Sequence, residues 1–336
     1  MIENRDKNKN AFKAWVALLR LPNLFTIPGD VAVGYLIAET MLGKSDFVLG
    51  YSVTSGTLTS LAYIYALISI VAFYCFGLLL NDIADFKEDS VDRPDRPLPS
   101  GAISMKSAKI AAGGLLFAGL LFAGIVNIRL FILTCFLATL IMGYNFLLKR
   151  ISMLGAATLA LCRIMTLLAG FLACGGVRLN FEHSPPFLVV ACATWAIYIF
   201  AVSVSARSET NPSKISNFDR RVTLFIPYLQ FFWICSATVV GGGAVAIDAA
   251  GEIPPGIILA LSLAALFAIG GIRGSRILAS RDSAPEKAQR SVGSLIRALI
   301  FLQASACAFL GYPYVAMTVA CFWIPARFAS QFFKGS

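Results

Sequence analysis

The stretch "GLLLNDIADFKEDSVDRPDRPLPSG", residues 77–101, begins as an apolar run and turns first acidic, then basic and rich in proline. Asp82, Asp85 and Asp89 are spaced three and four residues apart, and Asn81 precedes Asp85 by four. On a helix this spacing lines the acids along one face. They stand at the end of the second of a series of apolar runs, and that series decides the fold class.

The composition indicates an integral membrane protein. The chain has 336 residues, of which 58% are hydrophobic and 14% charged, and its mean hydropathy is +0.76. Soluble domains are about 45–50% apolar and about 25% charged. The net charge of +10 fits basic loops that face anionic lipid headgroups, so we expect membrane lipid and no nucleic acid as a partner.

The apolar runs predict an all-α, polytopic membrane helical bundle. A spanning helix needs about 20 mainly apolar residues. We predict a single transmembrane domain over residues 1–336, with 1–14 as a polar tail and 311–336 as an extra C-terminal helix. Pro28 is expected to kink the first helix. The predicted spans are about 15–38, 61–80, 108–126, 129–148, 152–174, 187–206, 222–247, 255–279, 290–310 and 313–332.

The basic residues predict the orientation of these spans. With a cytoplasmic N-terminus, alternation places 24 of the 28 Lys and Arg residues on the cytoplasmic side. The opposite side keeps Lys44, Arg129 and Arg178, and Arg163 falls inside a span. The positive-inside rule therefore places both termini and the acidic motif in the cytoplasm. We expect the membrane to be a bacterial inner membrane.

The acidic motif favours a metal-bridged phosphate site. Carboxylates this close repel one another and are costly to desolvate, and a divalent cation removes both problems. Mg²⁺ prefers oxygen ligands and completes its coordination with phosphate and water. A solvated, charged helix end is the alternative interpretation of the same pattern.

The segment that follows supports the phosphate site. Pro94, Pro97 and Pro99 exclude a continuing helix and predict a stiff extended loop. This loop would return Arg93 and Arg96 towards the acids, and arginine pairs bidentately with phosphate. Arg–Asp pairing within the loop itself is the structural alternative.

Three segments resemble a known family. "NDIADFKEDSVDRPDRPLPSGAIS" is similar to the first aspartate-rich motif of the UbiA superfamily of intramembrane prenyltransferases, roughly N-D-x-x-D-x-x-x-D followed by R-P-L-P-S-G. "RLPNLFTIPGDVAVGYLIA" resembles the family's first helix, with Arg20 and Asn23 in its Arg-x-x-Asn positions. "YNFLLKRISMLG", residues 144–155, resembles the segment after the fourth helix. The resemblance covers about residues 15–310, so the tenth helix would be an addition to the family's nine.

The resemblance implies a prenyltransferase with a central cavity that opens to the cytoplasm. An isoprenyl group would pass from a polyprenyl diphosphate to an unidentified, aromatic or lipid-like acceptor after Mg²⁺-assisted departure of diphosphate. Asp82 and Asp85 would be the catalytic residues. The metal ligands would be Asp82, Asp85, Asp89 and Glu209. The diphosphate-binding residues would be Asn23, Asn81, Arg93, Arg96, Lys149, Arg163 and Arg207.

The family's second acidic motif is reduced here. The segment "SVSARSETNPSKISNFDRR", residues 203–221, contains only Glu209 and Asp219 as acids. One or both of these acids would hold a second metal, or Arg207 and Lys214 would take over part of its charge-neutralising role. Another donor or a loss of activity is the remaining interpretation of this change. This contraction resembles that of a divergent branch, the EboC-like proteins.

Other interpretations stay open from the sequence. Arg163 at membrane depth fits a diphosphate contact or a structural tie to helix carbonyls. Lys149 fits the same pocket or the basic edge of the membrane. A non-catalytic or transport protein would use the acidic site to bind a cation or a phosphorylated lipid. CDP-alcohol phosphotransferases also place aspartates on membrane helices, but their longer signature is missing.

Overall fold

The structure is a computed structural model. Its longest described parts are residues 61–174 and 285–332. It also describes 13–41, 47–48, 51–52, 186–210, 221–222, 225–226, 229, 232–233 and 255–279. The predicted seventh span, 222–247, lies almost entirely outside these residues, and so does the polar tail up to residue 12.

The described chain is helical apart from one short antiparallel strand pair, β1 (Phe47–Val48) with β2 (Tyr51–Ser52). The first half holds α2 (Leu21–Leu24), α3 (Ile27–Met41), α4 (Leu61–Ala84), α5 (Phe86–Asp92), α6 (Met105–Val126), α7 (Ile128–Phe146), the 3₁₀ turn η2 (Leu148–Arg150) and α8 (Ser152–Ala173). The second half holds α9 (Pro186–Thr210), α11 (Pro255–Ala279), α12 (Pro285–Phe309), α13 (Pro313–Cys321) and α14 (Trp323–Phe332).

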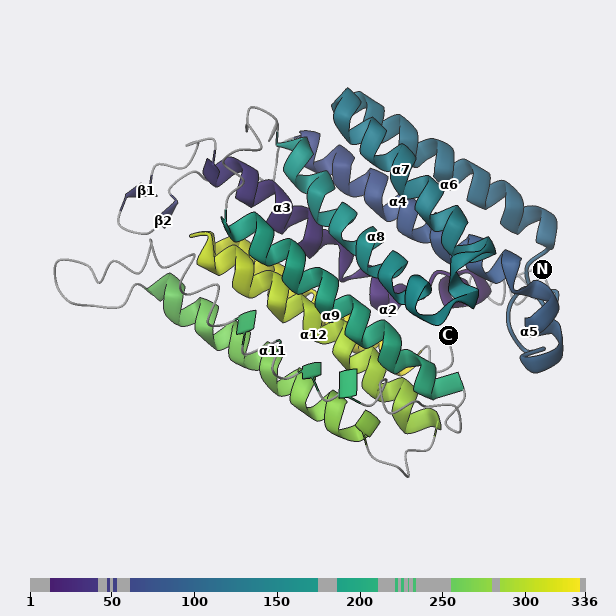
Figure 1. The fold of residues 1–336 in the computed structure, drawn as a ribbon. Coiled ribbons are helices and arrows are strands. Elements are labelled where there is room, and N and C mark those ends of the chain that lie inside the picture. The colour runs from purple at the N-terminus through teal and green to yellow at the C-terminus, as the bar shows by residue number, and fades with distance from the viewer. Residues whose placement is uncertain are drawn as a thin grey trace, which may run out of the picture.

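The long helices lie roughly side by side in one bundle. Helices α4, α6 and α7 form one side, α9, α11 and α12 form the other, and α3 and α8 lie between them (Figure 1). Helices α2 and α5 lie towards one end of the bundle, and the strand pair lies at the other. Within the described residues, eight helical segments are long and apolar enough to cross a membrane, and the first of these, Leu21–Met41, comprises α2 and α3 together. The predicted fold class is confirmed.

Two prolines break the first span into separate helices. A proline clashes with the carbonyl four residues before it and lacks an N–H, but it fits the first turn of a new helix. Helical structure accordingly stops at Leu18, four residues before Pro22, and α2 stops at Leu24, four residues before Pro28. Between the first two segments Arg20 adopts a left-handed backbone, with φ 42°. The predicted kink at Pro28 is therefore a complete helix break.

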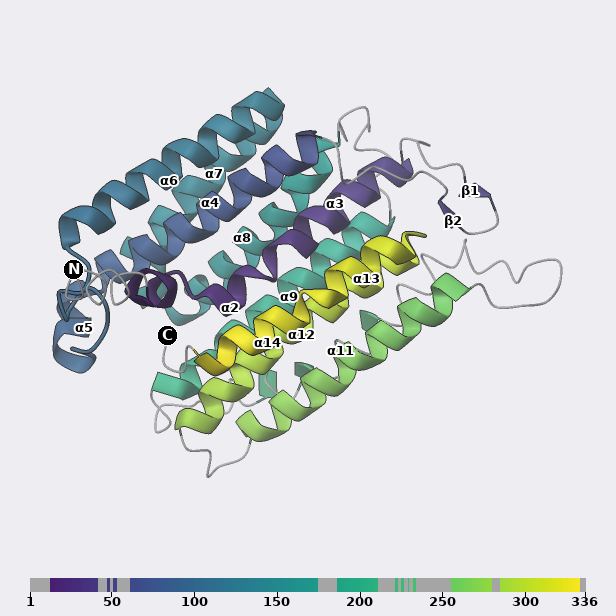
Figure 2. The ribbon, with the colours of Figure 1, turned by 180° about the vertical axis from the view of Figure 1, so that it is seen from behind.

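The C-terminal segment shows the same effect. Instead of one tenth helix, α13 and α14 follow one another along α12 (Figure 2). Pro325 lies in the first turn of α14, and its ring would clash with the carbonyl of Cys321, where α13 ends. With 9 and 10 residues, neither helix alone has the length of a span.

Glycines let α3 and α8 cross in backbone contact. A Cβ atom placed on Gly34 would lie 1.8 Å from the carbonyl oxygen of Leu167, and one on Gly170 would lie 2.0 Å from that of Val31. Small residues permit such close approach between membrane helices. Because the contact is reciprocal, it fixes how the two helices are rotated and brings Asp30 opposite the α8 face that carries Arg163.

Candidate functional site

The aspartate motif lies where α4 gives way to α5. Asp82 is in the last turn of α4, Asp85 stands between the two helices, and Asp89 is in α5. The i to i+4 hydrogen bonds continue across the junction, since the amide of Asp85 donates to Asn81 and that of Asp89 donates to Asp85. The three carboxylates therefore keep the helical spacing that the sequence predicted.

Asp82 and Asp89 share a guanidinium group. Arg96 Nη1 lies 2.6 Å from Asp89 Oδ2, to which it donates a hydrogen bond, and 3.9 Å from Asp82 Oδ1. Arg20 Nη2 lies 4.0 Å from the same Asp82 oxygen. The Asp82 and Asp89 side chains are 12% and 8% exposed, so both need a cationic partner.

Asp85 has a different partner. The ammonium group of Lys149, in η2 at the end of α7, forms a hydrogen-bonded ion pair with Asp85 Oδ1. Lys149 lies 64 residues further along the chain, so only the packing of α7 beside α4 creates this pair. Together with Arg20 and Arg96 it makes a cluster of three carboxylates and three cations, which we call the aspartate cluster: Asp82, Asp85, Asp89, Arg20, Arg96 and Lys149.

The loop after α5 differs from its prediction. It is a succession of turns, with Ser100 N bonded to Arg96 O and Ile103 N to Pro97 O, and not an extended segment. Proline fixes only its own φ angle and disfavours helix before it, and both limits are compatible with turns. The turns bring Arg96 back to the acids as predicted, whereas Arg93 is exposed and has no ion pair to another described residue.

The amide residues lie beside the cluster. Asn81 precedes Asp82 in the last turn of α4. Asn23, in α2, and the guanidinium groups of Arg20 and Arg163 all lie near Tyr74 of α4. Tyr74 therefore stands between the aspartate cluster and a second polar group deeper in the bundle.

Parts of the predicted second motif lie outside the described residues. Arg207 and Glu209 belong to the last turn of α9, but the structure does not describe their side chains. Lys214 and Asp219 fall in residues 211–220, which are also outside it. The roles predicted for these residues stay predictions.

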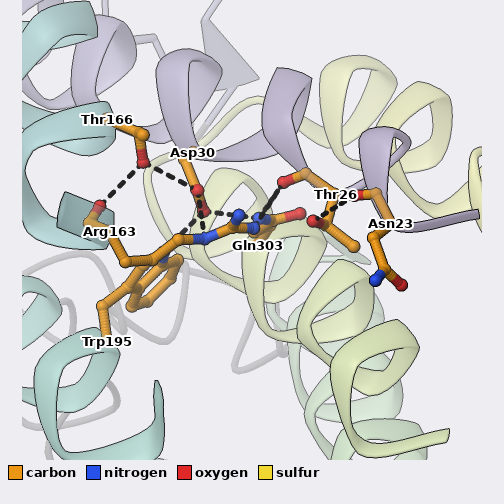
Figure 3. Close-up of polar contacts among 7 residues, drawn as sticks. All are labelled: Asn23, Thr26, Asp30, Arg163, Thr166, Trp195 and Gln303. Atoms are coloured by element: carbon orange, nitrogen blue, oxygen red, sulfur yellow. Dashed lines mark hydrogen bonds and ion pairs between the residues drawn. The ribbon is translucent and has the colours of Figure 1, made fainter. Parts of the chain in front are cut away.

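The second polar group centres on Asp30 in α3, which is completely buried (Figure 3). Its Oδ2 lies 2.6 Å from Arg163 Nε and accepts a hydrogen bond of 2.9 Å from the Thr166 hydroxyl. Its Oδ1 accepts hydrogen bonds from Trp195 Nε1 at 2.7 Å and from Gln303 Nε2. The Arg163 contact is an ion pair without hydrogen-bond alignment at Nε. These partners come from α8, α9 and α12.

This second group also holds the broken first span. Arg163 Nη2 and Gln303 Nε2 donate to the carbonyl oxygen of Thr26 at 2.8 and 2.7 Å. Thr26 is one of the two residues between α2 and α3. The sequence prediction named Arg163 but missed Asp30. Asp30 is the single acid in the predicted span 15–38, and Arg163 is the single basic residue inside the span 152–174. Charged residues at membrane depth usually pair with one another, so the two could have been paired from the sequence.

The aspartate cluster has the oxygen donors of a Mg²⁺ site but not the geometry of a preformed one. Among the side chains that the structure describes, no three His, Cys, Asp or Glu residues gather as a ready-made metal site. Each aspartate of the cluster instead faces a cationic side chain. The carboxylate oxygens are nevertheless the donors that Mg²⁺ prefers, so the residues fit the ion chemically if the cations move to another anion.

The sequence matches the model of the UbiA prenyltransferase family over residues 47–292. Similar curated proteins include the digeranylgeranylglyceryl phosphate synthase of Methanococcus aeolicus, 31% identical over 55% of this chain and 60% of that protein. The synthase of Sulfurisphaera tokodaii is 26% identical over 48% of this chain and 52% of that protein. The chain thus matches about half to three fifths of these relatives' length.

Solved structures share the fold. A UbiA homologue from Archaeoglobus fulgidus, bound to DMAPP and Mg²⁺, has a TM-score of 0.56 at 15% identity, with 91% of this chain and 99% of that chain covered. A digeranylgeranylglyceryl phosphate synthase structure has a TM-score of 0.53 at 18% identity, with 94% and 98% covered. Since the family model matches well over half of the sequence, the chain belongs to the UbiA prenyltransferase family.

Proposed function

We propose that this protein is a membrane prenyltransferase that binds an isoprenyl diphosphate at the aspartate cluster and transfers the isoprenyl group to a lipid-like acceptor. The observation that carries the proposal is the convergence of three carboxylates and three cations from α4, α5, the loop after α5, η2 and the residue before α2. The names of the similar curated proteins favour a glycerophosphate lipid as the acceptor.

The cluster is suited to an anion that arrives together with a metal. Three carboxylates face three cations, so their formal charges cancel, and neither a free cation nor a free anion meets a net opposite charge. A diphosphate would take the cations while the metal takes the carboxylates. Metal and diphosphate are therefore expected to strengthen each other's binding, which is a reciprocal coupling.

The cationic side chains of the cluster have N–H groups that can bind a diphosphate. Arg20 and Arg96 lie 4.0 and 3.9 Å from Asp82, which is too far for a hydrogen bond, so these contacts are purely electrostatic. Guanidinium N–H groups bind phosphate oxygens bidentately. Both arginines can therefore turn towards diphosphate oxygens with little loss at Asp82. Arg96 would exchange its hydrogen bond to Asp89, and Lys149 its hydrogen bond to Asp85, for bonds to phosphate oxygens.

Transfer of the isoprenyl group depends on neutralising the negative charge of the departing diphosphate at the aspartate cluster. The allylic C–O bond breaks, and the electron pair leaves with the diphosphate, whose growing charge the arginines and Lys149 stabilise. An acceptor oxygen then bonds to the allylic carbon and passes its proton to an oxygen of the departed diphosphate. Mg²⁺, held by Asp82, Asp85 and Asp89, would supply Lewis-acid neutralisation of the leaving group.

The decisive test uses two aspartates with the same formal charge change. The membrane-embedded protein is incubated with Mg²⁺, isoprenyl diphosphates of increasing length and a glycerophosphate lipid, and both diphosphate release and prenylated product are measured. Asp85→Asn should reduce turnover at least about a hundredfold, because it removes a metal ligand and the partner of Lys149. Asp95→Asn, in the exposed loop, is the matched control and should keep wild-type turnover.

Two results would count against this function. One is equal turnover of Asp85→Asn and the wild type. The other is transport of a cation across liposomes by the purified protein without consumption of any isoprenyl diphosphate, which would favour the transport alternative.

A further inference from the structure

We infer that the buried group around Asp30 is a positioning device for the aspartate cluster, and we call its three main members, Asp30, Arg163 and Gln303, the clamp. The inference rests on the proposed function for its kinetic test but on geometry alone for its structural test. Asp30 and Gln303 lie outside residues 47–292, the part of the chain that the family model matches.

The two hydrogen-bond donors of the clamp, Arg163 and Gln303, each contact two groups of the first span. Arg163 contacts both the Asp30 carboxylate and the Thr26 carbonyl, and so does Gln303. The carbonyl of Thr26 therefore accepts hydrogen bonds from two different helices, α8 and α12, at the point where the first span is broken. A carbonyl at a helix break needs such partners inside a membrane, because no water replaces them.

The side-chain amide of Gln303 is held in one orientation. Its Nε2 faces two acceptors, the Thr26 carbonyl and Asp30 Oδ1, so the amide cannot flip without placing its oxygen against them. Its Oε1 is buried without a hydrogen-bond partner, and a Cβ on Gly29 would lie 2.2 Å from it. The amide is thus held tightly against the first turn of α3.

The clamp is connected to the aspartate cluster through the short helix α2. Only Thr26 and Phe25 separate α3 from α2, a helix of four residues that begins after Arg20. A helix this short is not stable by itself, so its place depends on α14, which packs against it, and on what holds its ends. The clamp holds one end, and α2 then places Arg20 at Asp82 and Asn23 at Tyr74.

The clamp therefore acts on catalysis through other residues. Asp30 is completely buried and has its full set of partners inside the bundle, so it has no part in metal binding. Its negative charge keeps Arg163 in place, and Arg163 together with Gln303 fixes the carbonyl that ends the turn after α2. Loss of the clamp should move Arg20 away from the diphosphate position while the aspartates stay where they are.

The main test variant is Gln303→Met, compared with Ser305→Ala. Methionine preserves volume and charge, removes both amide hydrogen bonds, and leaves the Asp30–Arg163 ion pair in place. A changed affinity for isoprenyl diphosphate therefore cannot come from a lost charge. Ser305 lies two residues further along α12, is equally buried, and accepts a hydrogen bond of 3.0 Å from Trp233 that does not involve the first span. Both variants lose buried hydrogen bonds, but only one of them loosens the clamp.

Two measurements separate positioning from simple stability. The KM for isoprenyl diphosphate should rise about tenfold in Gln303→Met and stay at the wild-type value in Ser305→Ala. Amide hydrogen exchange over residues 21–26 should become about tenfold faster in Gln303→Met only. If KM and exchange in Gln303→Met match those of Ser305→Ala, the clamp is merely structural and the inference is wrong.

A second variant guards against ambiguous results. Asp30→Asn alone would leave the Arg163 charge buried and unpaired, which is strongly destabilising, so the neutral double variant Asp30→Asn/Arg163→Gln is used instead. It should reproduce the faster exchange over residues 21–26. If the wild-type protein consumes no isoprenyl diphosphate, the proposed function fails, but exchange still decides the clamp: faster exchange supports it and unchanged exchange overturns it.

Discussion

Alanine in place of Gly34 should force α3 and α8 apart. The added Cβ would lie 1.8 Å from the carbonyl oxygen of Leu167, whereas carbon–oxygen contacts in helix interfaces are about 3.3 Å. The two backbones would have to separate locally by about 1.5 Å. A backbone carbonyl cannot rotate away as a flexible side chain can, so the separation must be made by the whole helix.

The cost can be judged from overpacked protein cores. Extra methylene groups that side chains can partly avoid cost about 1–3 kcal/mol. Gly34→Ala should lie at the upper end, at about 3 kcal/mol, because its neighbour is backbone. A loss of that size lowers the melting temperature of a chain this long by roughly 4 °C. Gly170→Ala should behave similarly, since its Cβ would lie 2.0 Å from the Val31 carbonyl.

The measurement is thermal unfolding of the detergent-solubilised protein, followed by size-exclusion chromatography after heating. Gly113→Ala is the matched control, because a Cβ atom at that position of α6 would meet open space. Alanine also has a higher helix propensity than glycine. Its melting temperature should equal or slightly exceed that of the wild type. An unchanged melting temperature for both Gly34→Ala and Gly170→Ala would refute the close crossing.

Three further outcomes test the site. Lys149→Gln should raise the donor KM about tenfold, because a diphosphate partner is lost, whereas the exposed neighbour Arg150→Gln should leave it unchanged in the same assay. Gly29→Ala should press on Gln303 and repeat the faster exchange over residues 21–26, which mass spectrometry would detect. Chelation of divalent cations should stop diphosphate release but shift the melting temperature by less than about 2 °C, since the carboxylates keep their cationic partners; a large loss of stability would indicate a structural metal.

The helix ends show how far local sequence information reaches. Apolar length predicted the span at 61–80, and the structure continues this helix to Ala84 because the polar residues after Leu80 still form i to i+4 bonds. Proline positions predicted a disturbance at Pro28, but not that the helix stops and begins again. The choice between a kink and a break depends on contacts from other helices, and here α8 and α12 donate two hydrogen bonds to the Thr26 carbonyl within the break.

Hydrophobic length and the spacing of the acids are properties of neighbouring residues, and from them alone the chain is an all-α membrane bundle with Asp82, Asp85 and Asp89 at one helix end. Which cation meets which aspartate was decided only by the packing of the helices. Asp30 shows this most clearly, since its partners lie 136, 165 and 273 residues away. Such contacts depend on how each helix is rotated against its neighbours, and the glycine crossing of α3 with α8 sets that rotation, which hydropathy does not encode.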